Sequence, residues 1–476
     1  MTGTTLLVGP FNRVEGDLEI RLEVADGRVR AAYANSPLFR GFERILLGKA
    51  PLDALTITPR ICGICSISQS AAAAHALAHA GGTVPAPEGE KVAALLHGVE
   101  NLADHLTHFN LFFMPDFARP AYAGQGWHGR VADRFTAQQG ASVRAALQAR
   151  AQLFHVVGLL GGKWPHTLAI QPGGVTRAPT MRDKIRIKAD LGAFRAYLTE
   201  TLFGAPPEAF AALDTLEGLE AWGKGDAGLF LEIAAETGLA NMGTGQGRYL
   251  SFGAYPGPDG PAFARGVWRD GALHALDTGQ IVEDLSHAWM LGEAAHPAEG
   301  LTLPDEAMRD AAYSWCKAPR LAGLGYETGA LARQVVDGHP LARALACEGG
   351  VRARVVGRLL EIARLQVFLE ELLERIDPSA TFMAPLELPQ NGSGEGLVEA
   401  ARGALGHWCR IEDGRIAAYQ IVAPTTWNFS PRDSQGTPGP VEAALEGAPV
   451  REGEDTPISV QHIVRSFDPC MVCTVH

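Results

Sequence analysis

Residues 468–476 read DPCMVCTVH and contain a Cys-x-x-Cys pair, Cys470 and Cys473. A second pair, Cys62 and Cys65, lies hundreds of residues earlier in RICGIC, residues 60–65. Two thiols spaced by two residues can both face one ion, and four thiolates form a soft ligand set that suits zinc, iron–sulfur, nickel or copper. If the pairs share one site, the chain between them cannot divide into independent halves. We therefore expect a single unit over residues 1–476, with a metal site between its N- and C-terminal segments.

Composition excludes several classes of partner. The chain has 476 residues, a net charge of −12 and a pI near 5.7, which argues against nucleic acid and anionic membrane surfaces. No signal peptide and no apolar run long enough to span a bilayer are visible, so we expect a cytoplasmic protein without a direct membrane span. Seven cysteines in this length do not form a disulfide scaffold. We expect three of them to be buried as small apolar residues: Cys316, Cys347 and Cys409.

Hydrophobic periodicity predicts a mainly helical α+β protein. We expect a large helix-bundle core with small peripheral β-hairpins and sheets. Residues 18–31 and 410–422 each alternate around an Asp-Gly pair and predict two hairpins. The Gly- and Pro-rich segment 204–310 predicts short strands and loops, and 377–400 predicts a loop. Helices are expected over residues 66–80, 92–113, 131–160, 182–203, 351–376 and 457–467.

Cysteine spacing alone leaves the metal open. The simplest interpretation is a structural zinc, although small zinc modules usually separate their cysteine pairs by only about 15–20 residues. A redox or catalytic metal is the second interpretation. The third is that the two pairs are unrelated.

Further motifs add a family resemblance. RICGIC and DPCMVCTVH resemble the two signature motifs of the large subunit of nickel–iron hydrogenases. Other stretches resemble family motifs in the family's order: RVEG (13–16), DHLTHF (104–109), SWCKAPR (314–320), ARGALGH (401–407) and PTTWN (424–428). The resemblance implies heterolytic splitting of dihydrogen at a Ni–Fe centre whose iron also carries cyanide and carbon monoxide.

The resemblance also implies roles for the thiolates. Cys62 and Cys470 would be terminal nickel ligands, and Cys65 and Cys473 would bridge nickel to iron. Soft thiolates stabilise nickel in more than one oxidation state. Glu15 would be the first proton carrier from Cys470, although by residue type alone it would be a solvated surface carboxylate.

Polar residues around the metals follow from the same motifs. Arg402 would reach over the metals to a cyanide, held by Asp104 and Asp468 through charge-assisted hydrogen bonds. The competing interpretation of this trio is a structural ion-pair cluster. Thr425 would donate to the second cyanide, and Pro424 would line the iron pocket. Many family members carry a proline before the arginine, where this chain has Ala401.

A second, hard cation is implied near the C-terminus. Family members hold magnesium or a similar ion there, and such ions prefer oxygen ligands or water. By motif position, the ligands would be Glu43, the backbone carbonyl of Ile421 and a ring nitrogen of His476.

Three departures from the common family pattern favour a subgroup. Gln69 replaces a histidine, Ile64 replaces a small valine, and Phe112 replaces a leucine near the gas route. Together they resemble the regulatory subgroup, whose members sense hydrogen and signal to a histidine kinase. The alternative is ordinary core variation. The sequence's end at His476, without the extension of catalytic precursors, agrees with the sensor expectation.

These observations leave three functional hypotheses. The first is a hydrogen sensor, the second an energy-converting uptake hydrogenase, and the remote third a structural zinc scaffold. Either hydrogenase needs an iron–sulfur small subunit, because the isolated cysteines of this chain cannot build electron-transfer clusters.

Overall fold

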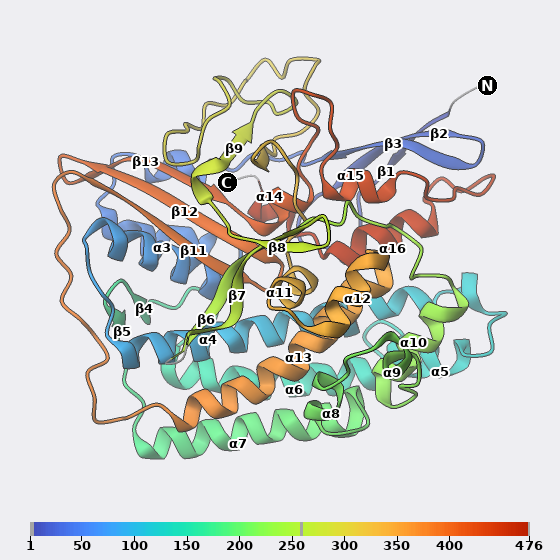
Figure 1. Cartoon of the computed structure of the whole chain (residues 1–476), viewed down its shortest axis with the longest axis horizontal. Coiled ribbons are helices and arrows are strands. Elements are labelled where there is room, and N and C mark those ends of the chain that lie inside the picture. Colours follow the sequence, from blue (N-terminus) through green and yellow to red (C-terminus); the bar gives the residue numbers. More distant parts are fainter. Residues whose placement is uncertain (1–3, 258–259, 475–476) are drawn as a thin grey trace.

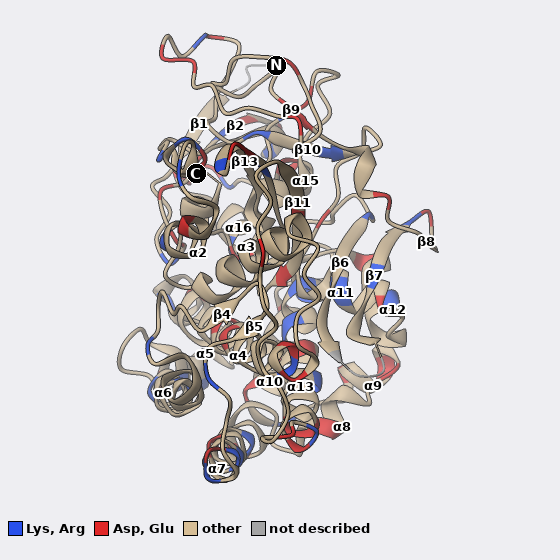
Figure 2. Cartoon of the chain, turned by 90° about the vertical axis from the view of Figure 1, so that its left-hand side faces the viewer, with Lys and Arg blue, Asp and Glu red and all other residues tan. Residues whose placement is uncertain are grey.

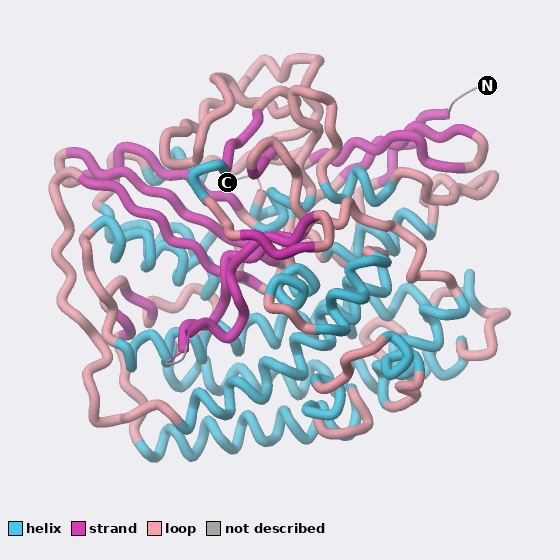
Figure 3. The backbone as a smooth tube through the Cα atoms, in the orientation of Figure 1, coloured by secondary structure: helices cyan, strands magenta, loops and turns pink. Residues whose placement is uncertain are grey.

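The computed structural model describes residues 4–257 and 260–474. Four long helices pack against one another in the lower half of Figure 1 and contribute a large share of the main apolar cluster. They are α4 (Pro87–Thr107), α6 (Ala141–Gly161), α7 (Met181–Tyr197) and α13 (Val351–Glu374). Figure 3 shows small sheets that lie mostly above these helices, so the predicted mainly helical α+β class is confirmed. The single unit over residues 1–476 stays a prediction, supported by one apolar cluster that extends from Val8 to Cys473.

Helix α13 forms because apolar side chains recur at helical spacing over most of its length. Val355, Leu359 and Leu369 are fully buried. At Gly357 the helix crosses α11 (Ala330–Val336) so closely that a Cβ would lie 2.8 Å from the Cα of Leu331. Glycine is therefore required at this crossing. On the outer side of the bundle, α7 carries interspersed acidic and basic residues (Figure 2).

Both predicted hairpins are present. Strands β2 (Glu19–Ala25) and β3 (Arg28–Asn35) are joined by Asp26 and Gly27, which both have positive φ, as a two-residue hairpin turn needs. Strand β1 (Thr4–Val8) extends this sheet. Strands β12 (Gly403–Glu412) and β13 (Arg415–Val422) form the second hairpin around Asp413 and Gly414.

The loop predicted over residues 377–400 is partly wrong, because its end forms strand β11 (Gly392–Ala400) beside β12. Its sequence, GSGEGLVEA, is too rich in glycine to read as a strand. The glycines are needed for a different reason. Strand β11 packs on α3 (Ser66–Ala80), and a Cβ at Gly394 would lie 2.1 Å from the carbonyl oxygen of Ala76.

Three helix predictions need correction. Residues 131–160 form two helices, α5 (His128–Phe135) and α6, because the chain turns at Gln138 with positive φ. Helix α4 ends at Thr107, and His108–Phe113 continues in π-helical form. Helix α7 likewise ends in a π-helical turn, Leu198–Leu202.

The segment 204–310 contains more helix than predicted. Helix α10 (Gly225–Glu236) is largely buried, and α8 (Pro207–Ala211) and α9 (Leu216–Glu220) precede it. Strands β6 (Tyr249–Gly257), β7 (Gly260–Arg269) and β8 (Ala272–His274) follow as a sheet.

The remaining elements are short, apart from α16 (Ile458–Phe467), which confirms the last predicted helix and leads to the second cysteine pair. Among the described residues, no helix combines the length and apolar content needed to cross a bilayer. The others are α1 (Phe42–Leu46), α2 (Ala54–Ile57), α12 (Pro340–Glu348), α14 (Pro424–Asn428), α15 (Pro440–Leu445), β4 (Ile170–Gln171), β5 (Gly174–Val175), β9 (Ile281–Asp284) and β10 (Ala318–Leu321).

Candidate metal centre

The two cysteine pairs meet inside the protein. The Sγ atoms of Cys62, Cys65, Cys470 and Cys473 all lie within 4.8 Å of one another, and all four residues are buried. Sγ separations are 3.4 Å for Cys62–Cys470, 3.4 Å for Cys65–Cys473 and 2.9 Å for Cys470–Cys473. A regular zinc tetrahedron with Zn–S bonds of about 2.3 Å has S–S edges of about 3.8 Å. These three separations are shorter than that edge, and the four sulfurs form a compact, buried ligand cage.

The backbone around the cage is held by a third segment, RVEG. The chain leaves α16 through Asp468, whose positive φ turns Cys470 inward. Glu15 pairs with Cys470 as a parallel bridge, and the N–H of Met471 donates to the carbonyl of Glu15 at 2.7 Å. A Cβ at Gly16 would lie 2.9 Å from the backbone nitrogen of Val472. Only glycine permits this close approach.

The thiols influence one another's protonation. Hydrogen bonds from Cys470 and Cys473 lower the pKa of Cys62 well below the usual thiol value. Hydrogen bonding to Cys470 instead raises the pKa of Cys65. The cage therefore favours a first thiolate at Cys62, which is the form that binds a metal ion.

Arg402 contacts both carboxylates that the resemblance assigns to it. Its guanidinium donates to Asp104 Oδ2 at 2.6 Å, Asp468 Oδ1 at 3.2 Å and the Asp468 carbonyl at 3.0 Å. All three residues are buried. Burial raises the pKa of Asp104 to about 7, against the opposing effect of Arg402. Burial also acts to raise the pKa of Asp468, but Arg402 and the other positive groups nearby together outweigh it and lower that pKa.

Two residues of α14 line the same region. Pro424 and Thr425 are buried in its first turn. The backbone N–H of Cys470 donates to Thr425 Oγ1 at 3.0 Å, so the hydroxyl proton of Thr425 is available for another acceptor. Predicted residues of PTTWN and DPCMVC are thus in direct contact.

Glu15 is half-buried beside the cage. Burial and the Cys62 thiolate raise the pKa of its carboxyl, while Arg402 and Arg40 lower it. A half-buried carboxyl with a raised pKa next to thiols is suited to exchange protons with them.

The predicted cation ligands are only partly described. Glu43 Oε1 accepts from the N–H of Ile421 at 2.7 Å, which brings these two residues together. His476 lies outside the described residues. The sequence did not predict Lys317, whose Nζ lies 3.4 Å from Glu43 Oε2 and 3.3 Å from Glu283 Oε2. Its ammonium balances part of the negative charge of this buried cluster.

The three subgroup positions differ in their surroundings. Gln69 is buried, and its Oε1 lies 2.8 Å from His407 Nε2, which in turn bonds Tyr419 through Nδ1. Ile64 and Phe112 are both half-buried. Ile64 packs against the main apolar cluster, and Phe112 lies in the π-helical segment after α4.

Glu100 is a buried residue that the sequence did not predict. It accepts from the backbone N–H groups of Ile67 and Ser68 at the N-terminus of α3, and from Trp164 Nε1 at 3.0 Å. It therefore caps the helix that follows Cys65, although it comes from α4. The only sequence signal for its burial is that Glu100 lies among the apolar residues of the predicted helix over residues 92–113.

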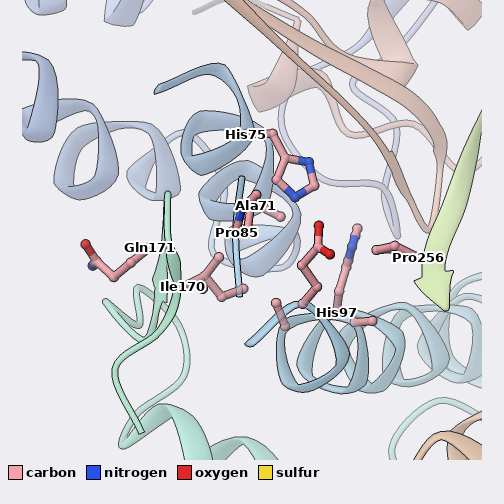
Figure 4. Close-up of a pocket in the computed structure, with 11 residues that line it drawn as sticks. Ala71, His75, Pro85, His97, Ile170, Gln171 and Pro256 are labelled. Carbon is pink, nitrogen blue, oxygen red and sulfur yellow. The ribbon is translucent and has the colours of Figure 1, made fainter. Parts of the chain in front are cut away.

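The capping network continues to a small cavity. Ser68 Oγ lies 3.0 Å from His97 Nε2, and His75 and His97 line a cavity of about 30 Å³ between α3 and α4 (Figure 4). Burial lowers the pKa of His97 to about 3, so its ring is neutral. The cavity is large enough for water.

The predictions for the isolated cysteines are only partly confirmed. Cys316 and Cys409 are buried as expected, but Cys347 is exposed near the end of α12. That helix is amphipathic, and Cys347 falls on its outer face.

The sequence matches a family model described as nickel-dependent hydrogenase over residues 40–125 and 230–476. It is 31% identical to the periplasmic NiFeSe hydrogenase large subunit of Desulfomicrobium baculatum, covering 98% of this chain and 94% of that protein. It is 28% identical to the uptake hydrogenase large subunit of Rhodobacter capsulatus and 26% to the quinone-reactive Ni/Fe-hydrogenase large chain of Wolinella succinogenes, covering at least 99% of this chain and 95% of each protein.

Solved structures agree with the sequence matches. A structure of the NiFeSe hydrogenase of Dm. baculatum superposes with a TM-score of 0.87 at 29% identity, covering all of both chains. One from D. vulgaris Hildenborough gives 0.87 at 27% identity, with the same coverage. Together with the four-cysteine cage, these matches favour a Ni–Fe centre over the zinc scaffold. The chain belongs to the nickel-dependent hydrogenase family and is a hydrogenase large subunit.

Proposed function

We propose that this subunit oxidises dihydrogen in an uptake-type hydrogenase, together with a small subunit that carries iron–sulfur clusters. The observation that carries the proposal is the buried cage of four cysteines with Arg402 beside it. Relatives named as uptake and quinone-reactive hydrogenases support this alternative better than the sensor prediction. The cytoplasmic location stays a prediction.

The cysteines would hold the metals, with Cys62 and Cys470 as terminal ligands and Cys65 and Cys473 as bridges. When bound, a Ni–Fe centre with cyanide and carbon monoxide on iron supplies heterolytic cleavage of dihydrogen. Glu15 would then take the proton that reaches Cys470. Its raised pKa and the backbone bridge between the two residues support this transfer.

The surrounding residues would orient the diatomic ligands. Arg402, fixed by Asp104 and Asp468, would donate to one cyanide, and the Thr425 hydroxyl would donate to the other. The guanidinium of Arg402 is held by Asp104 Oδ2 and Asp468 Oδ1, so its direction is fixed by the protein before any diatomic ligand is present. Pro424 would form part of the wall.

A magnesium ion would stabilise the C-terminal segment. Glu43 and the carbonyl of Ile421 would be ligands, and His476 would complete the protein set. The proximity of Glu43 and Ile421 supports this site. Lys317 limits the net negative charge there, so water would supply the remaining ligands.

The sensor role is the second candidate, favoured by Gln69, Ile64 and Phe112. Steady-state dihydrogen oxidation by the purified complex with a redox dye distinguishes the two. Sustained turnover, on the order of 10 per second or more, supports the uptake role. A turnover far below this, together with hydrogen-dependent control of a histidine kinase, would overturn it in favour of the sensor.

A further inference from the structure

Arg402 lies in a tight turn that rests on another helix. Ala401 and Arg402 form the two-residue connection between β11 and β12, since Ala400 pairs with Gly403. Gly403 has a φ of +130°, and a Cβ there would lie 2.3 Å from Thr328 Oγ1. The turn therefore sits directly on residues 328–329, where α11 begins.

The side chain of Arg333 in α11 is hydrogen-bonded to this turn. Arg333 donates to the carbonyl of Ala400 at 2.8 Å and to the carbonyl of Ala401 at 3.0 Å. Its other three N–H groups donate to Glu361 Oε2 at 2.8 Å, Glu361 Oε1 at 2.7 Å and Glu399 Oε2 at 2.7 Å. All five guanidinium donors are thus used. The side chains of Arg333, Glu361 and Glu399 are completely buried.

The same network reaches Arg402 from its other side. Glu361 Oε1 lies 3.0 Å from His105 Nε2, and His105 follows Asp104, which binds the Arg402 guanidinium. Glu361 is thereby linked to both the turn that carries Arg402 and the helix that carries its carboxylate partner. The network forms a closed ring through α11, α13, α4 and the β11–β12 turn.

We propose that Arg333 is a positioning residue for Arg402 and fixes its guanidinium over the metal centre. The proposal rests on the proposed contact between Arg402 and an iron-bound cyanide. Ala401 occupies the place where many family members carry proline, so the ring that would fix φ there is missing. The two hydrogen bonds from Arg333 supply the rigidity instead. Buried ion pairs are often no more stabilising than apolar residues of similar volume, so stability alone does not account for this network.

Arg333→Lys in the complete complex tests the proposal. Lysine keeps the charge but has three donors and no planar fork, so it cannot hold both carboxylates and both carbonyls. We expect the infrared cyanide bands to shift and kcat for dihydrogen oxidation to fall on the order of tenfold, with unchanged nickel content. Unshifted bands and unchanged kcat would overturn the proposal.

Arg320→Lys is the matched control. Arg320 is also buried, pairs with Asp433 at 2.9 Å and donates to the carbonyl of Pro431 at 3.0 Å, but its hydrogen bonds to the described residues do not include the Arg402 turn. It should therefore leave the cyanide bands in place. Equal shifts in both variants would reduce Arg333 to a general packing role and overturn its specific one.

Arg402→Lys separates the two proposals. If its cyanide bands do not move, the contact between Arg402 and cyanide is wrong. If they move while those of Arg333→Lys do not, Arg402 keeps its role and only the positioning inference fails.

Should Arg333→Lys not assemble, Glu399→Gln tests the same inference, because it removes the charge of one partner of Arg333. We expect a smaller shift in the same direction, and unshifted bands would again overturn the inference.

Discussion

Replacing Gly357 with alanine tests how closely α11 and α13 must pack to hold the centre. The new Cβ would lie 2.8 Å from Leu331 Cα and 2.9 Å from Leu331 N, whereas ordinary contact begins at 3.4 Å. Because both atoms belong to the backbone of α11, α11 and α13 must move apart by about 0.6 Å. Overpacking of this kind costs about 1–3 kcal/mol, and the better helix propensity of alanine recovers at most about 1 kcal/mol.

We therefore expect Gly357→Ala to destabilise the protein by about 1–2 kcal/mol, measured as a lower midpoint of thermal unfolding of the complex. Since α11 carries Arg333, the infrared cyanide bands should shift as well. Gly192→Ala in α7 is the control, because among the described residues no atom apart from the adjacent backbone of α7 lies within 4 Å of the added Cβ. It should be neutral or stabilising by up to about 1 kcal/mol. The packing account is refuted if both variants have the midpoint and bands of the wild type.

Three further predictions concern proton transfer, gas access and acid stability. Glu15→Gln should abolish hydrogen–deuterium exchange while nickel and iron remain bound, and full exchange activity would remove Glu15 from the mechanism. Ile64→Val combined with Phe112→Leu should make activity in air oxygen-sensitive, because smaller side chains would widen the gas route for dioxygen, and unchanged activity would show that these side chains do not limit gas access. Burial acts to raise the pKa of Asp116, but His462 and nearby arginines lower it well below 3.8, so its stabilisation is present above that pH and is lost as the pH falls. Asp116→Asn should thus flatten the acid limb of the stability curve, and an unchanged limb would contradict the pKa direction.

The sequence predicted those elements whose local signals agree with their tertiary roles. Helix α13 carries a continuous apolar stripe, and the two hairpins each have an Asp-Gly turn. Strand β11 was missed because its glycines serve the close approach to α3 and not strand propensity. The break between α5 and α6 was missed because residues 136–140 contain only one glycine and no proline as a helix-ending signal.

The residues of the candidate site likewise fall into those that the sequence predicted and those that it did not. The cysteines and Arg402 could be found because they stand in short motifs. Arg333 and Glu361 could not, because a charged residue in a helix usually indicates a solvated face. Arg333 of α11 meets its partners on α13 and β11 only in the folded protein. No short motif in the sequence predicts these contacts.

Metal analysis and infrared spectroscopy of the purified complex test the central claim most directly. If the cage of Cys62, Cys65, Cys470 and Cys473 holds a Ni–Fe centre, nickel will occur once per large subunit of the complex. The spectrum will then show bands from iron-bound cyanide and carbon monoxide. Zinc bound at this cage, with no such bands, would contradict the account.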